Sequence, residues 1–268
     1  MTCKRSVIVL VAALSACAAQ IEEPPSNTGP NPDSPRVLDG LQVLYTFEEG
    51  DGLAVRDVSR VEPAFDLQLD NLVTNKWLPD GGIQIVGPSV ITSPEIAEKV
   101  FVACVQANAV TLEAWVEPDN VTQQATIFTY SRQGARNVTL AVDTTRYAAS
   151  VLTSSPDPAM PGMTIDSLET VQTPVDKATV AAQHVVYTRD VSGASVYLNG
   201  VDTAPPTTTT PPTTPTAKDQ TGWSPSDQLA LANEIGGGRP WLGKIFLAAI
   251  YCRKLSAAEV AKNFAAGH

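Results

Sequence analysis

The segment VTLEAWV, residues 110–116, alternates apolar side chains with other side chains at a period of two. This alternation is typical of a β-strand, because successive side chains of a strand point to opposite faces of its sheet. One face of the predicted strand carries Val110, Leu112, Ala114 and Val116, and the other carries Thr111, Glu113 and Trp115. The segment therefore predicts a strand with an apolar face turned toward a core.

Similar alternation recurs along the chain. NVTLAV (137–142) repeats it, and HVVYTRDVSGASVYLNG (184–200) indicates two strands joined by a turn at 190–193, where Gly193 can adopt a positive φ. Further strands are predicted at residues 43–48, 83–86, 126–131, 229–235 and 244–251. This pattern indicates an all-β fold, a two-sheet antiparallel sandwich.

One short helix is predicted after the last strand. Ser256 and Glu259 have the S-x-x-E spacing of a capping box, Val260 and Phe264 share an apolar side, and Gly267 can end the last turn. We expect this short C-terminal helix to pack against the edge of the sandwich.

Four segments resemble the laminin G-like, concanavalin A-like jelly-roll domains of bacterial surface proteins, which are also pentraxin-like. They are LYTFEEGDGLAVRDVS (44–59), VTLEAWVEP (110–118), HVVYTRDVSGASVYLNGV (184–201) and RPWLGKIFLAAIYCRKLSAAEV (239–260). The resemblance covers roughly residues 37–268 and implies a jelly roll. Because this fold hosts lectins, adhesive modules, polysaccharide hydrolases and lyases, it does not by itself define a function.

The N-terminal residues are typical of a secretory signal. Lys4 and Arg5 precede an apolar run, residues 7–14, that is too short to span a bilayer. The tetrapeptide LSAC, ending at Cys17, resembles the lipobox of bacterial lipoproteins. We predict a lipoprotein signal peptide (1–16) and lipidation of Cys17; ordinary cleavage with a soluble product is the alternative. Ala18 is compatible with transfer to the outer membrane, so the expected location is the bacterial cell envelope.

Two proline-rich tracts flank and interrupt the predicted domain. Residues 17–36 are expected to be an exposed tether, because their prolines and small polar residues cannot form a core. The Thr/Pro-rich tract at 204–216 is predicted to be a surface loop within the domain, since its prolines cannot join a central sheet.

Two of the four cysteines remain for the mature domain, because Cys3 lies in the predicted signal peptide and Cys17 is the predicted lipid site. An exported pair most simply forms a disulfide, so we predict a bridge between Cys104 and Cys252, with two buried free thiols as the alternative. In the resembling family a polar residue usually stands at the position of Cys252. The resemblance thus makes this bridge an added link between neighbouring strands.

The formal charge of −10 argues against nucleic acid as a partner, because phosphate backbones attract basic surfaces. Hydrolases of the resembling class often carry E-x-D-x-E on one strand, and this motif is absent from the sequence. Glu113 lies on a predicted strand without a recognisable second acid, and His184 is a lone candidate base. The GGGR segment (236–239) is interpreted as a tight turn rather than a phosphate loop. We therefore expect no catalysis.

Binding is the function class that remains. Trp223 and Trp241 are candidate ligand contacts, because sugar rings stack on indoles, although Trp241 is also a candidate for packing. Calcium is common in laminin G-like relatives, and the weak candidate ligands are Glu48, Asp51 and Asp57. The hypothesis is a lipid-anchored envelope protein that binds a glycan or a surface protein. A polysaccharide-active enzyme and a purely structural envelope protein are the alternatives.

Overall fold

The computed structural model describes residues 35–203 and 218–268. The predicted signal peptide, Cys17, nearly all of the tether and the whole Thr/Pro-rich tract lie outside these residues. Within the two described ranges, no helix is long and apolar enough to cross a membrane.

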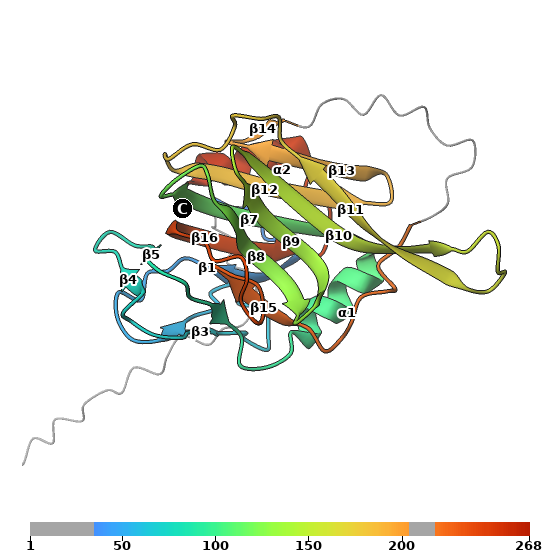
Figure 1. The fold of residues 1–268 in the computed structure, drawn as a ribbon, viewed down its shortest axis with the longest axis horizontal. Coiled ribbons are helices and arrows are strands. Elements are labelled where there is room, and N and C mark those ends of the chain that lie inside the picture. The colour runs from blue at the N-terminus through green and yellow to red at the C-terminus, as the bar shows by residue number, and fades with distance from the viewer. Residues whose placement is uncertain (1–34, 204–217) are drawn as a thin grey trace, which may run out of the picture.

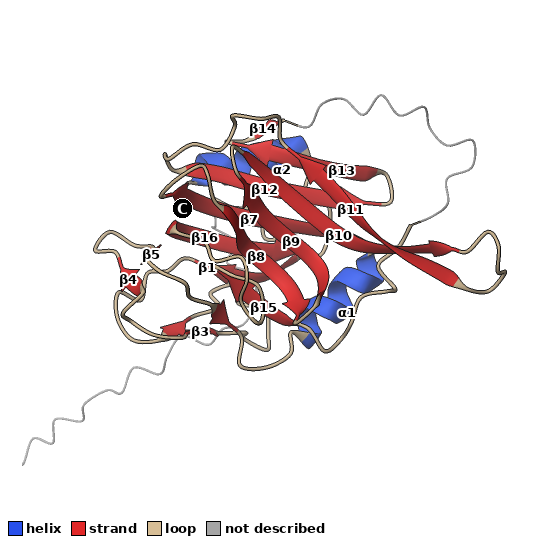
Figure 2. Cartoon of the chain, in the orientation of Figure 1, coloured by secondary structure: helices blue, strands red, loops and turns tan. Residues whose placement is uncertain are grey.

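Two antiparallel sheets form a sandwich (Figures 1 and 2). Sheet A has the order β14-β13-β12-β7-β16-β5-β4, and β1 also pairs with β16. The strands of sheet A are β1 (Leu41–Tyr45), β4 (Asn75–Trp77), β5 (Ile83–Ile85), β7 (Val110–Pro118), β12 (Gln183–Asp190), β13 (Gly193–Leu198), β14 (Val201–Asp202) and β16 (Gly243–Tyr251).

Sheet B has the order β11-β10-β9-β8-β15-β6-β3-β2. Its strands are β2 (Ala54–Val55), β3 (Leu67–Leu69), β6 (Ile91–Thr92), β8 (Gln124–Arg132), β9 (Ala135–Asp143), β10 (Arg146–Pro156), β11 (Thr164–Gln172) and β15 (Gln228–Leu231). The predicted sandwich is confirmed, and the predicted strands fall on β1, β5, β7, β8, β9, β12, β13, β15 and β16.

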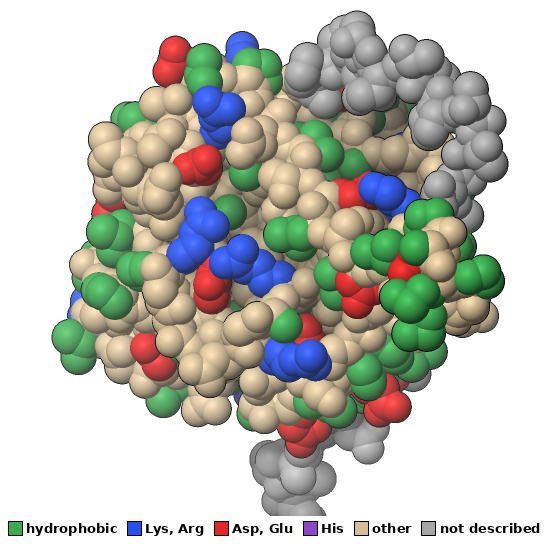
Figure 3. All heavy atoms as spheres, turned by 45° about the vertical axis from the view of Figure 1, so that its right-hand side comes forward, with side chains coloured by type: hydrophobic (Ala, Val, Ile, Leu, Met, Phe, Trp, Pro, Cys, Tyr) green, Lys and Arg blue, Asp and Glu red, His purple; other side chains and the backbone are tan. Residues whose placement is uncertain are grey.

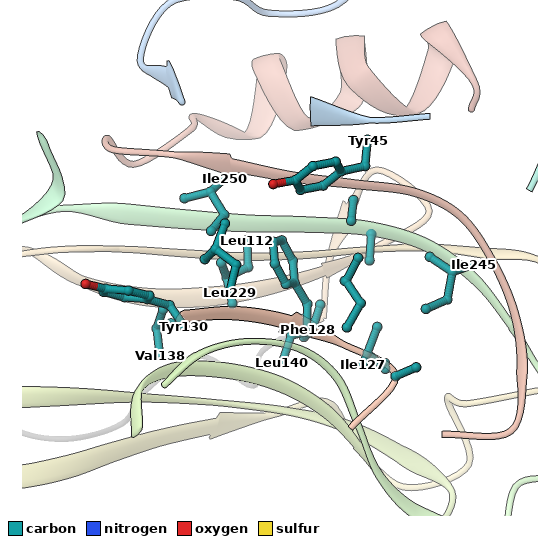
Figure 4. Close-up of a cluster of buried hydrophobic side chains, with 14 of the residues drawn as sticks. Tyr45, Leu112, Ile127, Phe128, Tyr130, Val138, Leu140, Leu229, Ile245 and Ile250 are labelled. Carbon is teal, nitrogen blue, oxygen red and sulfur yellow. The ribbon is translucent and has the colours of Figure 1, made fainter. Parts of the chain in front are cut away.

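The VTLEAWV segment forms β7 in the middle of sheet A, between β12 and β16. Its four predicted core residues are fully buried and belong to the main hydrophobic cluster between the sheets. Leu112 lies beside Ile250 of β16 in this cluster, with Phe128 and Leu140 of sheet B close by (Figure 4). The predicted alternation of this strand is confirmed.

The outer face of sheet A is covered by α2 (Ala257–Ala266). Ser256 and Glu259 form the predicted capping box. Val260 packs in a second apolar cluster with side chains of β12, β13 and β16, so the helix lies over a sheet face rather than at an edge. The physical reason is that this face also carries large apolar residues, such as Val186 and Leu247, which need cover.

A second helix, α1 (Glu98–Ala107), was not expected from the sequence. Its N-cap residue, Ala97, makes no side-chain cap hydrogen bond, so the usual start signal is missing. Buried Val100 and Cys104 lie four residues apart on its inner side. Cys104 is joined by the predicted disulfide to Cys252, the residue after β16, so the alternative of two free thiols is excluded. The bond links a helix to the end of a strand rather than the two neighbouring strands that were expected.

The predicted turns take the expected forms at two places. Asp190 pairs with Gly193 across the β12–β13 hairpin, and Gly193 has a φ of 127°. The three glycines of the GGGR segment all have positive φ, as a tight turn requires. β15 ends earlier than predicted, at Leu231, and the next residue, Ala232, has a φ of 64°.

Candidate functional site

The two tryptophans predicted to contact a ligand are both buried. Trp223 is 3% exposed, packs against Tyr130 and donates its indole N–H to the carbonyl of Leu152 at 2.9 Å. Trp241 is 0% exposed and belongs to the main core cluster. Neither ring presents a face to a sugar, so their assignment as ligand contacts is corrected to core packing.

The calcium candidates do not converge on one point. Asp57 is buried, accepts backbone N–H groups of Leu44, Ser59 and Phe65, and pairs with Lys99 Nζ at 2.7 Å. Its charge is therefore balanced by an ammonium group, while Glu48 and Asp51 are exposed in the preceding segment between β1 and β2. In the described ranges, no group of three or more His, Cys, Asp or Glu residues is placed to hold a metal ion. This structure does not support a calcium site at Glu48, Asp51 and Asp57.

Glu113 and His184 lie together on the outer face of sheet A, where β7 pairs with β12. Both side chains are fully buried, and His184 Nε2 lies 2.8 Å from Glu113 Oε1. Arg36 Nη1 also donates to Oε1, at 2.6 Å, and Asn263 Nδ2 donates to Oε2 at 2.8 Å. We call Arg36, Glu113, His184 and Asn263 the sealed cluster.

The sealed cluster holds Glu113 ionised. Burial disfavours the carboxylate, but hydrogen bonds from His184 and Arg36 and the charge of Arg36 outweigh it, so the pKa of Glu113 falls from 4.5 to about 2. Trp115 stacks on Phe264 of α2 and contacts the ring of His268, which closes the cluster from outside. A substrate cannot reach Glu113, so its role is structural.

A pocket of about 430 Å³ opens on the outer side of sheet B. It is lined by the end of β8, the start of β9, the middle of β10 and β11, and the loop after β15. The lining residues are Ser131, Arg132, Gly134, Ala135, Arg136, Leu152, Leu168, Glu234 and Ile235. We call this the arginine pocket. Figure 3 shows that Lys and Arg side chains gather near the centre of one face of the protein.

A bulge between β8 and β9 places Arg136 in the arginine pocket. Tyr130 pairs with Val138, but the next residue, Ser131, pairs with Arg136, so Asn137 is an extra residue on β9. Without this shift, Arg136 would lie on the core side with Val138. The bulge turns it to the side of Ser131, which is the outer side of the sheet.

The two arginines of the pocket differ in how they are held. Arg136 Nη2 forms an ion pair with Glu234 Oε1, and its side chain is 35% exposed. Arg132 Nη1 donates to Ser224 Oγ and lies 3.5 Å from Asp227 Oδ1, while its side chain is 52% exposed. Burial raises the pKa of Asp227, against the opposing charge of Arg132.

Leu152 and Leu168 give the pocket an apolar wall. They are opposite each other in the register of β10 and β11, and Leu168 is 48% exposed. An apolar wall beside guanidinium, hydroxyl and carboxylate groups matches the two sides of a sugar ring, one apolar and one rich in hydroxyls. The sequence analysis missed this site, because its residues come from four strands and a loop.

The two packed sheets define the class of protein as an antiparallel β-sandwich. A laminin G family model, described as the concanavalin A-like lectin/glucanases superfamily, matches residues 95–261, more than half of the chain. The chain belongs to this family. A search of curated proteins found no match.

Several solved structures share the fold. A Trypanosoma rangeli sialidase bound to 2,3-difluorosialic acid is 17% identical, with 84% of this chain and 33% of the sialidase covered at a TM-score of 0.52. A botulinum neurotoxin type C, whose cell entry depends on interaction with two ganglioside molecules, is 9% identical; 87% of this chain and 52% of the toxin chain are covered, at a TM-score of 0.61. The binding domain of botulinum neurotoxin DC, in complex with rat synaptotagmin II, is 11% identical; 87% of this chain and 53% of that chain are covered, at a TM-score of 0.60. The chain spans about a third of the sialidase and about half of each toxin chain, and identities this low show a shared fold alone.

Proposed function

We propose that this protein is a non-catalytic recognition module that binds a glycan in the arginine pocket. The observation that carries the proposal is the composition of the pocket wall: two guanidinium groups and a serine hydroxyl beside two leucines. Guanidinium and hydroxyl groups supply directed hydrogen bonds to sugar oxygens, and the leucines supply contact for the apolar face of a ring. A chain that shares this fold, the botulinum neurotoxin type C, depends for cell entry on interaction with two ganglioside molecules, which supports the proposal.

The carboxylates of the described chain favour binding over hydrolysis. Glycoside hydrolysis generally uses two carboxyl groups about 5–10 Å apart across the scissile bond. Glu234 is the single carboxylate among the residues that line the arginine pocket, and it is paired with Arg136. Glu113, the other candidate acid, is sealed beneath α2.

The direct test is binding of the full chain to a polysaccharide panel, while the same mixtures are monitored for new reducing ends. We expect retention of at least one polysaccharide with no release of reducing ends, and the same retention in the presence of a chelator. New reducing ends would show that the protein is an enzyme. Retention of none of the polysaccharides would leave the proposal without support and favour a protein contact or a structural role.

We also propose that the protein is anchored in the bacterial envelope through a lipid on Cys17. The support is the sequence around Cys17, which resembles a lipobox after a signal-like apolar run. Replacing Cys17→Ala should release the protein from the membrane fraction of cells that express it. Unchanged membrane retention of the variant would contradict lipid anchoring and leave glycan binding untouched.

A further inference from the structure

The arginine pocket is less acidic than the protein around it. The chain carries a formal charge of −10, whereas the charges of Arg132 and Arg136 are matched by Glu234 in the pocket wall and by buried Asp227, 3.5 Å from Arg132. Exposed guanidinium groups on an acidic protein indicate an anionic ligand, because the surrounding charge disfavours anions that lack a specific contact.

We infer that the arginine pocket selects a glycan that carries a carboxylate, and that Arg132 is the residue that binds this carboxylate. This inference rests on the proposed glycan binding and names the chemical class of the sugar. A guanidinium group binds a carboxylate through two parallel N–H···O bonds, which give both strength and orientation.

Arg132 has the donors that such a contact needs. Among the residues that the structure describes, its hydrogen bonds to Ser224 and its ion pair with Asp227 all use Nη1. Nε and Nη2 therefore remain for a ligand, and these two atoms form one edge of the planar guanidinium. The side chain is 52% exposed, and Arg132 is one of the residues that line the pocket.

Arg136 plays a different part in the same pocket. Its guanidinium is paired with Glu234, whose Oε1 is also 3.5 Å from Thr126 Oγ1. This pairing balances the one negative charge in the pocket wall, so that Glu234 does not repel an incoming carboxylate. Arg136 thus positions Glu234, while Arg132 is the ligand contact.

The remaining wall suits a sugar ring attached to the carboxylate. Leu152 and Leu168 lie opposite each other on β10 and β11, and they offer an apolar surface next to the arginines. The volume of about 430 Å³ is within the usual range of small-molecule sites, about 300–1,000 Å³. A sugar that presents its carboxylate to Arg132 can therefore lay its apolar face on the leucines.

The test compares the full chain with its Arg132→Gln variant on carboxylated, sulfated and neutral polymers. The carboxylated probes are polygalacturonate, alginate, hyaluronan and polysialic acid; dextran sulfate, dextran and fully methyl-esterified pectin complete the set. The control is Arg56→Gln, which removes the same charge from sheet B at an exposed ion pair with Asp66, among residues that do not line the arginine pocket. Thermal unfolding of both variants verifies that they are folded.

We expect at least one carboxylated polymer to bind the full chain, and Arg132→Gln to weaken that binding about 10- to 100-fold, the loss of a charge-assisted contact. Arg56→Gln should bind as the full chain does, and methyl esterification should remove binding of the pectin.

Three results would overturn the inference. Unchanged affinity of Arg132→Gln would exclude Arg132 as the carboxylate contact. Equal binding of dextran sulfate would show selection of charge rather than of a carboxylate. Preferred binding of dextran would refute the acidic class and leave the proposed glycan binding intact. Failure of the proposed function itself is distinguishable, because then none of the seven polymers would bind the full chain.

Discussion

Each sheet of the sandwich carries an arginine–glutamate pair on its outer face, and the two pairs have opposite surroundings. On sheet A, Arg36 and Glu113 are covered by α2 and lie next to His184. On sheet B, Arg136 and Glu234 are partly exposed and line a pocket with Arg132. The residue types are nearly the same, so it is the cover over each face that decides whether the charged groups are buried in the fold or accessible to a ligand.

The covered pair shows what burial requires of a charge. Each oxygen of Glu113 accepts at least one hydrogen bond, and the carboxylate stays ionised although it is 0% exposed. In the open pocket, Arg132 keeps donors that no described residue uses. A buried cluster whose hydrogen-bonding groups all have partners stabilises the fold. A solvated group with unused donors is available to a ligand.

The largest loss of stability is expected when the disulfide between Cys104 and Cys252 is removed. The bond joins residues 148 apart, so in the chain-entropy model the double variant Cys104→Ala, Cys252→Ala should lose about 5 kcal/mol of unfolding free energy. Urea unfolding with and without dithiothreitol measures this difference. Reductant should destabilise the parent protein and leave the double variant unchanged; an equal response of both would contradict a stabilising role of the bond.

Breaking the sealed cluster comes next. Glu113→Gln removes the buried carboxylate that accepts hydrogen bonds from Arg36, His184 and Asn263, so unfolding free energy should fall by about 4 kcal/mol. The matched control on the same strand is Glu117→Gln, whose partner Lys244 is partly exposed; it should lose less than about 1 kcal/mol. Urea unfolding measures both losses of unfolding free energy. Similar losses in the two variants would show that burial of an ion pair does not determine how much it stabilises this protein.

The pH dependence of unfolding free energy tests the same cluster, because the charge of Glu113 is removed by protonation. The pKa of Glu113 is about 2 in the folded protein against 4.5 ordinarily, so its stabilisation, about 3 kcal/mol, is complete above pH 4.5 and is lost as the pH falls toward 2. The measurement is the difference in unfolding free energy between the parent protein and Glu113→Gln at pH 7, 4 and 2.5. This difference should narrow as the pH falls, and a constant difference would contradict the lowered pKa.

The smallest effect is expected on the open side. Arg132→Gln should change unfolding free energy by less than about 1 kcal/mol, because Arg132 is half exposed and its pair with Asp227 is 3.5 Å long. Chemical unfolding of this variant beside Glu113→Gln completes the comparison. A loss as large as that of Glu113→Gln would mean that the arginine pocket is part of the structural framework.

The fold could be predicted from the sequence because several of its strands alternate apolar core residues with more polar residues. β7 and β9 show this alternation directly, and the capping box of α2 has a local signature. Helix α1 escaped prediction because it lacks a cap, and β11 escaped because much of it is exposed and few of its apolar residues alternate. β10 does alternate, with Tyr147, Ala149 and Val151 buried, and the sequence analysis missed it.

The two charged sites could not be predicted in the same way. Arg36 reaches Glu113 across 77 positions and Asn263 reaches it across 150, and no local pattern indicates such contacts. The arginine pocket depends on a one-residue bulge at Asn137, which reverses the direction that alternation gives to Arg136. The tryptophans were assigned from their chemistry alone, and burial overrode that assignment.

The position of Arg36 has a mechanical consequence. Arg36 bonds to Glu113 and to the carbonyl of Gly267, and the backbone N–H of Val37 bonds to Asn263 of α2, so the chain joins the sandwich on sheet A. If the chain is anchored at Cys17, as proposed, a pulling force on the tether reaches this ion pair and α2 first. The strands of the arginine pocket belong to the other sheet, so tension between the anchor and a bound ligand crosses the sandwich from sheet A to sheet B.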